Sequence, residues 1–137
     1  GDKYVDFTQP DPSGKNISVS DFKNKIVLLE FWASWCYGCV ETNPQLVQLY
    51  KKYKDKNFEI IGISLDSKKQ DWLKAIEKGN LNWTQLSDLN GAHNKAALIY
   101  GINAIPDNFL IDKTGKILAR NINAQTLNKK LAELCNK

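Results

Sequence analysis

Residues 26–39 read IVLLEFWASWCYGC, and this stretch decides the fold. Its beginning is almost wholly apolar, which predicts a buried strand over Ile26–Trp32. A helical pattern starts near Val40, so the two cysteines stand where a strand passes into a helix. Two thiols three positions apart at a helix start can form a disulfide, and the helix dipole stabilises a thiolate there. We interpret Cys36 and Cys39 as a redox pair, with Cys36 the more exposed and attacking sulfur.

A Cys-x-x-C pair is also compatible with a structural zinc half-site or with two core cysteines. A closed zinc site needs four ligands, commonly as two close pairs. The chain offers only Cys36, Cys39, Cys135 and His93, with no second close pair, which disfavours zinc. Cys135 falls on the apolar side of the last predicted helix and is expected to be buried, whereas His93, beside a turn, is expected at the surface.

The composition favours one soluble globular domain. The chain has 137 residues, of which 42% are hydrophobic, enough for a sizeable core. Its longest nearly uncharged run, 26–40, is shorter than the roughly 20 residues of a membrane-spanning helix. The net charge of +4 comes from scattered lysines and a single arginine, Arg120, which argues against nucleic-acid binding. We expect Gly1 to be an artificial or processed end, compatible with a signal, lipid anchor or domain removed upstream.

The remaining pattern alternates short strands and helices. Strands are predicted over 5–7 and 17–19 as an N-terminal hairpin, then over 58–65, 109–111 and 117–120. Helical segments are predicted over 21–24, capped by Ser20, and over 70–78, 93–100 and 126–136. The helix after Cys36 should bury a face formed by Val40, Val47, Leu49, Tyr50 and Tyr53, and should be kinked by Pro44. The buried face of the next helix should be formed by Trp72, Leu73 and Ile76. This order predicts an α/β fold with crossover helices.

These motifs carry a resemblance to a known family. EFWASWCYGC over 30–39 with Pro44, followed by GINAIP over 101–106, resembles the thioredoxin superfamily. The N-terminal hairpin, the long segment 64–100 and FLID at 109–112 with Gly115 are similar to the TlpA/ResA-type thiol:disulfide oxidoreductases of the AhpC/TSA-like group. The resemblance implies a thioredoxin-like fold over 1–137: a central mixed sheet flanked by helices, with an N-terminal hairpin and an inserted helical segment. We expect this single domain to be part of a longer envelope protein.

The resemblance also implies roles for individual residues. Cys36 matches the family's nucleophilic cysteine and Cys39 its resolving cysteine, while Trp35 matches the tryptophan that flanks the disulfide. Pro106 matches the family's cis-proline, and Ile105 before it matches the residue that pairs with the substrate backbone. Sequence alone does not show whether the Pro106 bond is cis.

Glu30 occupies the position of thioredoxin's buried aspartate. It lies in an apolar run, where burial should raise the pKa of its carboxyl group. We predict that Glu30 accepts the proton of Cys39, directly or through a water, when Cys39 displaces the substrate. The alternative is a structural carboxylate paired with a nearby lysine.

Four positions depart from the family pattern. Tyr37 and Gly38 replace the Gly-Pro of thioredoxin between the cysteines, beside the expected substrate site. Asp107 replaces the threonine after the cis-proline and should place a charge near the docking edge. ResA-like proteins carry a glutamate three residues after the second cysteine, where this chain has Thr42; Glu41 is one residue off and is not assigned that role.

The predicted function is thiol-disulfide exchange with protein disulfides or thiols. We expect a reductase rather than an oxidase, because strong oxidants often carry a histidine between the cysteines and this chain has none there. We expect no cofactor beyond the redox-active disulfide, since no phosphate-binding loop is present. The resemblance implies a membrane thiol carrier as electron donor, a bacterial periplasmic or envelope location and a membrane tether outside this chain. Two alternative functions remain. The first is a copper-binding module, because Cys36 and Cys39 are able to hold Cu(I). The second is a peroxiredoxin-type peroxidase, which is related but carries a threonine three positions before its reactive cysteine, where this chain has Ala33.

Overall fold

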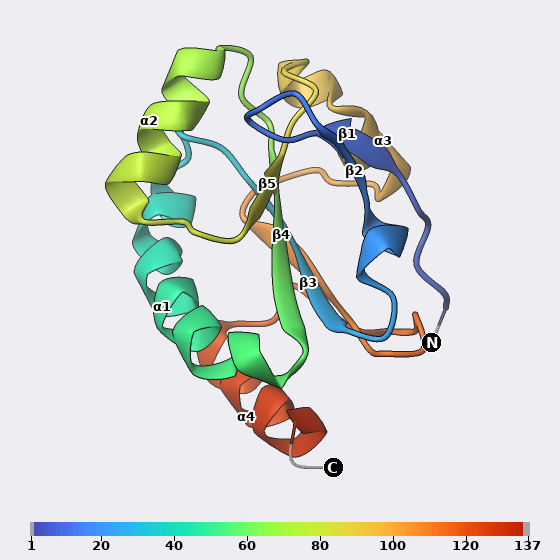
Figure 1. Cartoon of the computed structure of the whole chain (residues 1–137). Coiled ribbons are helices and arrows are strands. Elements are labelled where there is room, and N and C mark those ends of the chain that lie inside the picture. The colour runs from blue at the N-terminus through green and yellow to red at the C-terminus, as the bar shows by residue number, and fades with distance from the viewer. Residues whose placement is uncertain (1, 136–137) are drawn as a thin grey trace.

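A five-stranded mixed sheet forms the centre of the computed structural model, which describes residues 2–135. The strand order is β5-β4-β3-β6-β7 (Figure 1). The central strand β3 (Ile26–Trp32) runs parallel to β4 (Phe58–Ser64) and antiparallel to β6 (Asp107–Ile111). The edges are β5 (Thr84–Leu86), parallel to β4, and β7 (Ile117–Arg120), antiparallel to β6. All of β3 is buried, as expected for an apolar strand covered on both faces.

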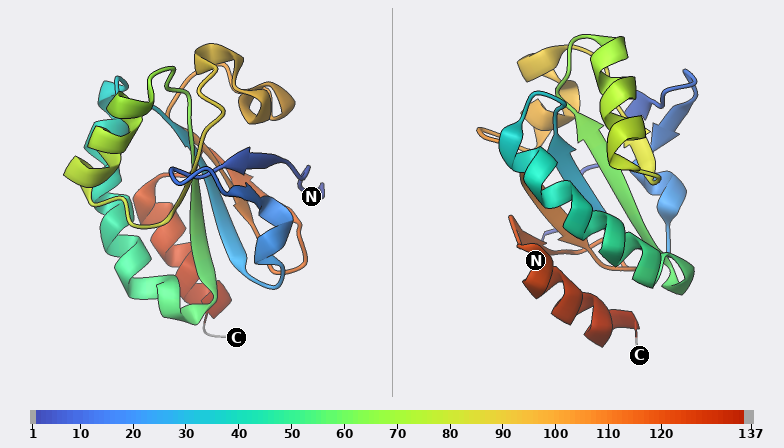
Figure 2. Two further views of the ribbon diagram at one scale, coloured as in Figure 1. Left: turned by 45° about the horizontal axis from the view of Figure 1, so that its top comes forward. Right: turned by 90° about the vertical axis from the view of Figure 1, so that its left-hand side faces the viewer.

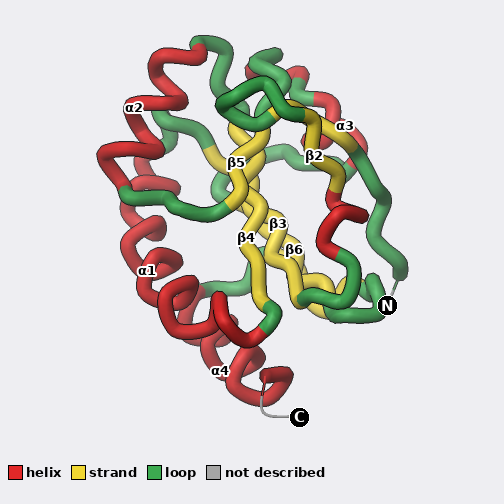
Figure 3. Tube along the Cα trace, in the orientation of Figure 1, coloured by secondary structure: helices red, strands yellow, loops and turns green. Residues whose placement is uncertain are grey.

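Helices cover both faces of this sheet. One face carries α1 (Tyr37–Tyr53), α2 (Lys69–Gly79) and α4 (Ala124–Cys135), as Figure 2 shows from two further sides. The other carries α3 (Lys95–Ile99) and a separate hairpin of β1 (Thr8–Pro10) and β2 (Asn16–Ser18) (Figure 3). Short 3₁₀ turns occupy Val19–Phe22, Lys54–Lys56 and Gly91–His93. Within residues 2–135, no helix is both long and apolar enough to cross a membrane.

Because α1 directly follows the central strand, its first turn lies at the carboxyl end of β3. Two layers of apolar side chains hold it there. Beneath α1 and α4, Leu46 and Leu131 are buried with the sheet residues, while Phe31 and Tyr100 pack with their ring centres 5.9 Å apart on the opposite face. Ligands of open α/β sheets bind at this edge, so the fold places the cysteines at the expected position for a functional site.

The N-terminal hairpin exists, but the prediction of its strands was shifted. The first strand is β1, three residues later than 5–7, and the second is β2 rather than 17–19. The register is set by Asp11, whose side chain accepts the backbone N–H groups of Ser13 at 2.8 Å and Lys15 at 3.0 Å. The helical turn after the hairpin also begins earlier, because Ser18 rather than Ser20 is its cap and donates its N–H to Asp21.

The buried face of α1 was predicted only in part. Leu49 and Tyr53 are buried as expected, but Val40 is 53% exposed. The helix instead buries Leu46 and the polar Asn43. Because the buried face includes a polar residue, the spacing of apolar residues alone predicted this face only in part.

The segment between β4 and β6 differs from the prediction in three details. Strand β5 was not predicted, and the helix expected over 93–100 is a 3₁₀ turn followed by α3. Helix α2 buries Trp72 but leaves Leu73 38% exposed, so the predicted stripe was wrong at that residue. The helix ends at Gly79, and its C-cap residue Asn80 adopts a left-handed backbone conformation with φ 53°.

The C-terminal helix was predicted over 126–136, and its last position, Asn136, lies outside the described residues. Within α4, Cys135 is only partly buried, which corrects the expectation of a core thiol. Its Sγ lies 3.9 Å from the Lys56 carbonyl oxygen. His93 is exposed, as predicted.

Candidate active site

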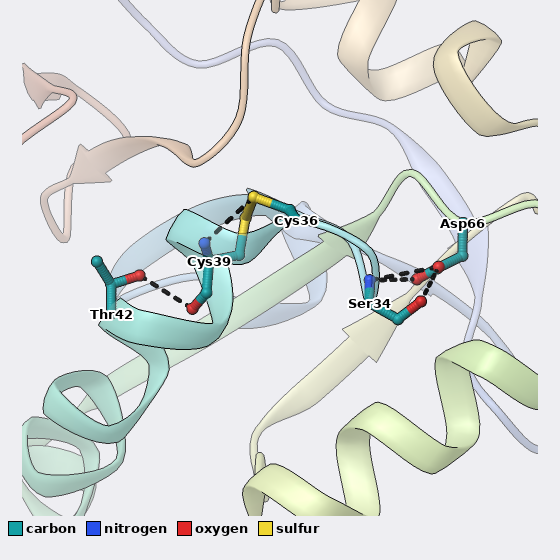
Figure 4. The surroundings of a disulfide bond; sticks show 5 residues. All are labelled: Ser34, Cys36, Cys39, Thr42 and Asp66. Atoms are coloured by element: carbon teal, nitrogen blue, oxygen red, sulfur yellow. Dashed lines mark hydrogen bonds between the residues drawn. A yellow bond between two sulfur atoms is a disulfide. The ribbon is translucent and has the colours of Figure 1, made fainter.

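Cys36 and Cys39 form a disulfide at the first turn of α1 (Figure 4). Cys36 is the N-cap of the helix, and its Sγ accepts the backbone N–H of Cys39 at 3.2 Å. The Cys36 side chain retains some exposure, 7% for the residue, whereas Cys39 has none. The helix N-terminus therefore directs a donor at the sulfur that solvent reaches, which stabilises a thiolate there.

Exposed apolar side chains surround this pair. Trp35 is 66% exposed and Tyr37 77%, although both are large and apolar, and Val40 continues the surface along α1. Exposed hydrophobic groups around a reactive centre are typical of a surface that binds other proteins.

The loop before β6 approaches the disulfide turn from the opposite side. The Ile105–Pro106 peptide bond is cis. A Cβ atom on Gly38 would lie 3.3 Å from Cδ of Pro106, so this proline packs directly against the turn between the cysteines. Close contact explains why a residue without a side chain suits position 38. The structure thus places Pro106 against Gly38 between the two cysteines, with Trp35 and Tyr37 exposed on either side of Cys36. That these residues and Ile105 contact the substrate stays a prediction.

Glu30 lies in the middle of β3, only 2% exposed. Neither of its carboxyl oxygens has a hydrogen-bond partner among the described residues, and burial raises its pKa to about 8. This agrees with the rise expected from its apolar surroundings. The alternative of a lysine pair is wrong, because the described residues contain no such partner.

A cavity of about 300 Å³ lies beside Glu30 and extends to Pro106, the proline that packs against the disulfide turn. Its lining includes Thr42 and Pro106, and Thr42 donates its hydroxyl to the carbonyl oxygen of Cys39 at 3.1 Å. The cavity is large enough for several water molecules and carries polar groups that would bind them. The cavity therefore gives water access to the Glu30 side of the site, while Cys39 itself is not among its lining residues.

Asp107 does not present a free charge at the docking edge, which corrects that expectation. It is 8% exposed, and its carboxylate accepts Nη2 of Arg120 at 2.9 Å. The same Nη2 also donates to the Gly101 carbonyl oxygen at 3.3 Å. Arg120 therefore neutralises Asp107 and ties the two ends of the loop 101–106 together.

Sequence reasoning missed Asp66, which holds the loop before Cys36. This carboxylate is 1% exposed and accepts the Ser34 backbone N–H at 3.1 Å and the Ser34 hydroxyl (Figure 4). It also accepts the Ser64 hydroxyl. The available signal was its place just beyond the end of a buried parallel strand, where functional polar residues gather.

Replacing Asp66 with alanine should lower the free energy of unfolding by about 3 kcal/mol, because the N–H and two hydroxyl groups would lose their acceptor in a buried place. Urea unfolding of the oxidised protein measures this change. Asp55→Ala, at an exposed position, is the control and should change stability by less than about 0.5 kcal/mol. Equal stability of the two variants would show that Asp66 does not anchor the loop.

Potential metal ligands do not gather elsewhere in the part of the chain that the structure describes. No group of three or more His, Cys, Asp or Glu side chains is placed to hold a metal ion there. The cysteine pair is thus the chemical centre that the geometry offers.

Comparison with known proteins also indicates thiol-disulfide chemistry. The profile of the AhpC/TSA family matches residues 1–120. The thiol-disulfide oxidoreductase ResA of Bacillus thuringiensis subsp. konkukian is 34% identical over 137 residues, covering the whole chain and 77% of that protein.

Solved structures extend the likeness to the fold. A thiol-disulfide oxidoreductase from Bacteroides fragilis superposes with a TM-score of 0.90 at 42% identity, covering 97% of this chain and 99% of that one. The thioredoxin domain of a thiol-disulfide oxidoreductase from Bacteroides vulgatus gives 0.91 at 33% identity, covering 99% and 97%. The predicted thioredoxin-like α/β fold and thiol-disulfide oxidoreductase activity are therefore confirmed. The chain belongs to the AhpC/TSA family and, within it, to the thioredoxin-like thiol-disulfide oxidoreductases of the ResA/TlpA type.

Proposed function

We propose that this chain is a single thioredoxin-like domain that reduces disulfides in client proteins, with Cys36 as nucleophile and Cys39 as resolving thiol. The observation that carries the proposal is the cysteine pair itself, capping α1 with one partly exposed and one fully buried sulfur. A buried second sulfur suits a resolving role because clients reach only the first.

The exchange proceeds in two steps. The Cys36 thiolate attacks one sulfur of the client disulfide, forming a mixed disulfide and releasing the other client sulfur as a thiolate. Cys39 then loses its proton and attacks Cys36 Sγ, which releases the second client thiolate and forms the Cys36–Cys39 disulfide. Two electrons pass from the pair to the client. We assign Glu30 as the acceptor of the Cys39 proton, directly or through a water molecule supplied by the cavity beside Glu30.

Client polypeptides would bind to the apolar surface around the sulfurs. Trp35 and Tyr37 offer exposed aromatic rings, while Gly38 keeps the disulfide turn open to Pro106. The backbone of Ile105 lies beside the proline and is available to pair with an extended client strand.

The pair carries the redox equivalents itself, so we propose no further cofactor. The sequence Tyr37-Gly38 places no histidine between the cysteines, which favours a reductase. We further propose that the protein acts in the bacterial periplasm or cell envelope, held at the membrane by a segment outside this chain and reduced by a membrane thiol carrier; its similarity to ResA supports this proposal.

The equilibrium reduction potential of the Cys36–Cys39 pair, measured against glutathione, tests the direction of this chemistry. A value near −270 mV, about that of thioredoxin, is expected for a reductase. A value near −120 mV, about that of a strong periplasmic oxidant, would contradict the proposal. Insulin reduction is measured on the same sample, with and without Cu(I), since a copper-binding module would bind the metal but show no reductase turnover.

A further inference from the structure

A groove of about 550 Å³ runs between α1 and α2 and begins beside the disulfide. Ser34 and Val40 line its near end, and Val40 donates its N–H to the Cys36 carbonyl oxygen at 3.1 Å. Pro44 lies further along α1. Both helices follow parallel strands and so run in the same direction, with their first turns at the same edge of the sheet as Cys36.

A buried amide without a partner lies in this groove. Asn43 is 6% exposed, and its Oδ1 has no hydrogen-bond donor among the described residues. A buried acceptor that lacks a donor costs about 1–3 kcal/mol. Because this oxygen is itself buried, a ligand N–H group would recover that cost once the Asn43 side chain turns toward the groove.

The charges on the α2 side are mainly positive. Lys74 and Lys78 line the groove from exposed positions one helical turn apart, and neither forms an ion pair with another described residue. Asp71 is the single carboxylate among the lining residues. The groove thus combines the apolar side chains of Val40 and Pro44, an unused amide and two lysines.

We propose that this groove is a binding subsite for the client polypeptide, which lies in it with an apolar residue followed by acidic residues while Cys36 reacts with the client's cystine. The inference deepens the proposed function and rests on it. From Cys36 to Pro44 the helix rises about 12 Å, which an extended peptide spans in three to four residues. A client that extends along α1 would bring its third and fourth residues from the reacting cysteine beside Pro44, and we propose that these residues are acidic and face the lysines of α2. The Asn43 side chain would turn toward the groove to accept a backbone N–H of the same segment.

Two synthetic peptides test this preference. Each has one cysteine in a mixed disulfide with 2-thiopyridine and leucine two positions away on both sides. One peptide has glutamate, the other lysine, at the third and fourth positions. The fully reduced protein attacks the peptide sulfur, and release of 2-thiopyridone gives the rate. The neutral small molecule 2,2′-dithiodipyridine reports the reactivity of Cys36 without a peptide.

The variants separate the groove from general charge. Lys74→Glu combined with Lys78→Glu reverses the charge of the α2 side. Lys113→Glu combined with Lys129→Glu makes the same change in net charge at exposed positions outside the groove. Asn43→Leu removes the amide at nearly constant volume, and its melting temperature verifies that it folds.

The wild-type protein and the control double variant should react about fivefold faster with the acidic peptide than with the lysine peptide. The groove double variant should reverse that order. Asn43→Leu should slow both peptides about fivefold relative to dithiodipyridine. All variants should react with dithiodipyridine at the wild-type rate.

Identical peptide selectivity in the groove and control double variants, with dithiodipyridine rates intact, would overturn the subsite while leaving the proposed function standing. A wild-type protein that does not react with dithiodipyridine would instead refute the proposed function. If sedimentation shows a dimer that only the groove double variant abolishes, a second copy of the chain occupies the groove, and the subsite is likewise refuted.

Discussion

Replacing Cys39 with serine should turn the protein into a trap for its clients. Without the second thiol, the mixed disulfide between Cys36 and the client has no internal route to resolution and accumulates. Replacing Cys36 with serine should reduce turnover to the background of free thiols, because the remaining Cys39 sulfur is fully buried. Mass spectrometry of unreduced samples after mixing with a disulfide-bonded client measures both outcomes: a covalent adduct for Cys39→Ser and none for Cys36→Ser.

Cys135→Ser is the matched control. This third cysteine lies on α4, where burial raises the pKa of its thiol, so it is a weak nucleophile at neutral pH. The variant should retain wild-type turnover and form no lasting adduct. Continued turnover by Cys39→Ser would show that another thiol resolves the mixed disulfide and would remove Cys39 from the mechanism.

Local sequence signals were sufficient where one physical cause dominates. The bounds of β3 and β7 agree with the prediction, since a continuous apolar run or a turn signal defines each. The place of the cysteines at the start of α1 follows from the strand before them. Short elements lacked such signals. Strand β5 has only three residues, and its pairing with β4 depends on a neighbour distant in sequence.

The site was predictable in its sulfur chemistry but less so in its support. The partners Asp66 and Ser34 are 32 positions apart, and Asp107 and Arg120 are 13 apart. The periodicity of apolar residues in the sequence does not predict such pairs, because only the tertiary fold brings the two residues together. Asn43 shows the converse problem: a polar residue on a buried helix face shifts the apparent phase of the helix and conceals the groove beside the disulfide.

Replacing Glu30 with glutamine should remove a large pH dependence of stability. The folded-state pKa of Glu30 is about 8 against an ordinary value of 4.5, so the folded protein retains this proton where the unfolded chain has released it. The protonated carboxyl group favours folding below pH 4.5, and that contribution is lost as pH rises toward 8. The difference corresponds to about 5 kcal/mol between pH 4 and pH 9.

Urea unfolding across this pH range, with the Glu30→Gln profile subtracted from the wild-type profile, isolates the contribution of Glu30 from all other groups. The difference should grow in favour of the glutamine variant as pH rises and should level off above pH 8. Glu77→Gln, at an exposed position on α2, should show no such trend. A flat difference for Glu30→Gln would mean that the carboxyl group is solvated in the folded protein.

The same variant tests the proton transfer. In the wild-type protein, decay of the mixed disulfide should accelerate as pH rises toward 8, because only the deprotonated Glu30 accepts the Cys39 proton. Glutamine cannot accept a proton, so Glu30→Gln should slow this step about 100-fold at pH 8 and lose the inflection, while the initial attack by Cys36 keeps its rate. Stopped-flow measurement of both phases distinguishes them. Equal decay rates in the two proteins would leave water alone as the proton acceptor, because Glu30 is the buried carboxyl group that has no hydrogen-bond partner among the described residues.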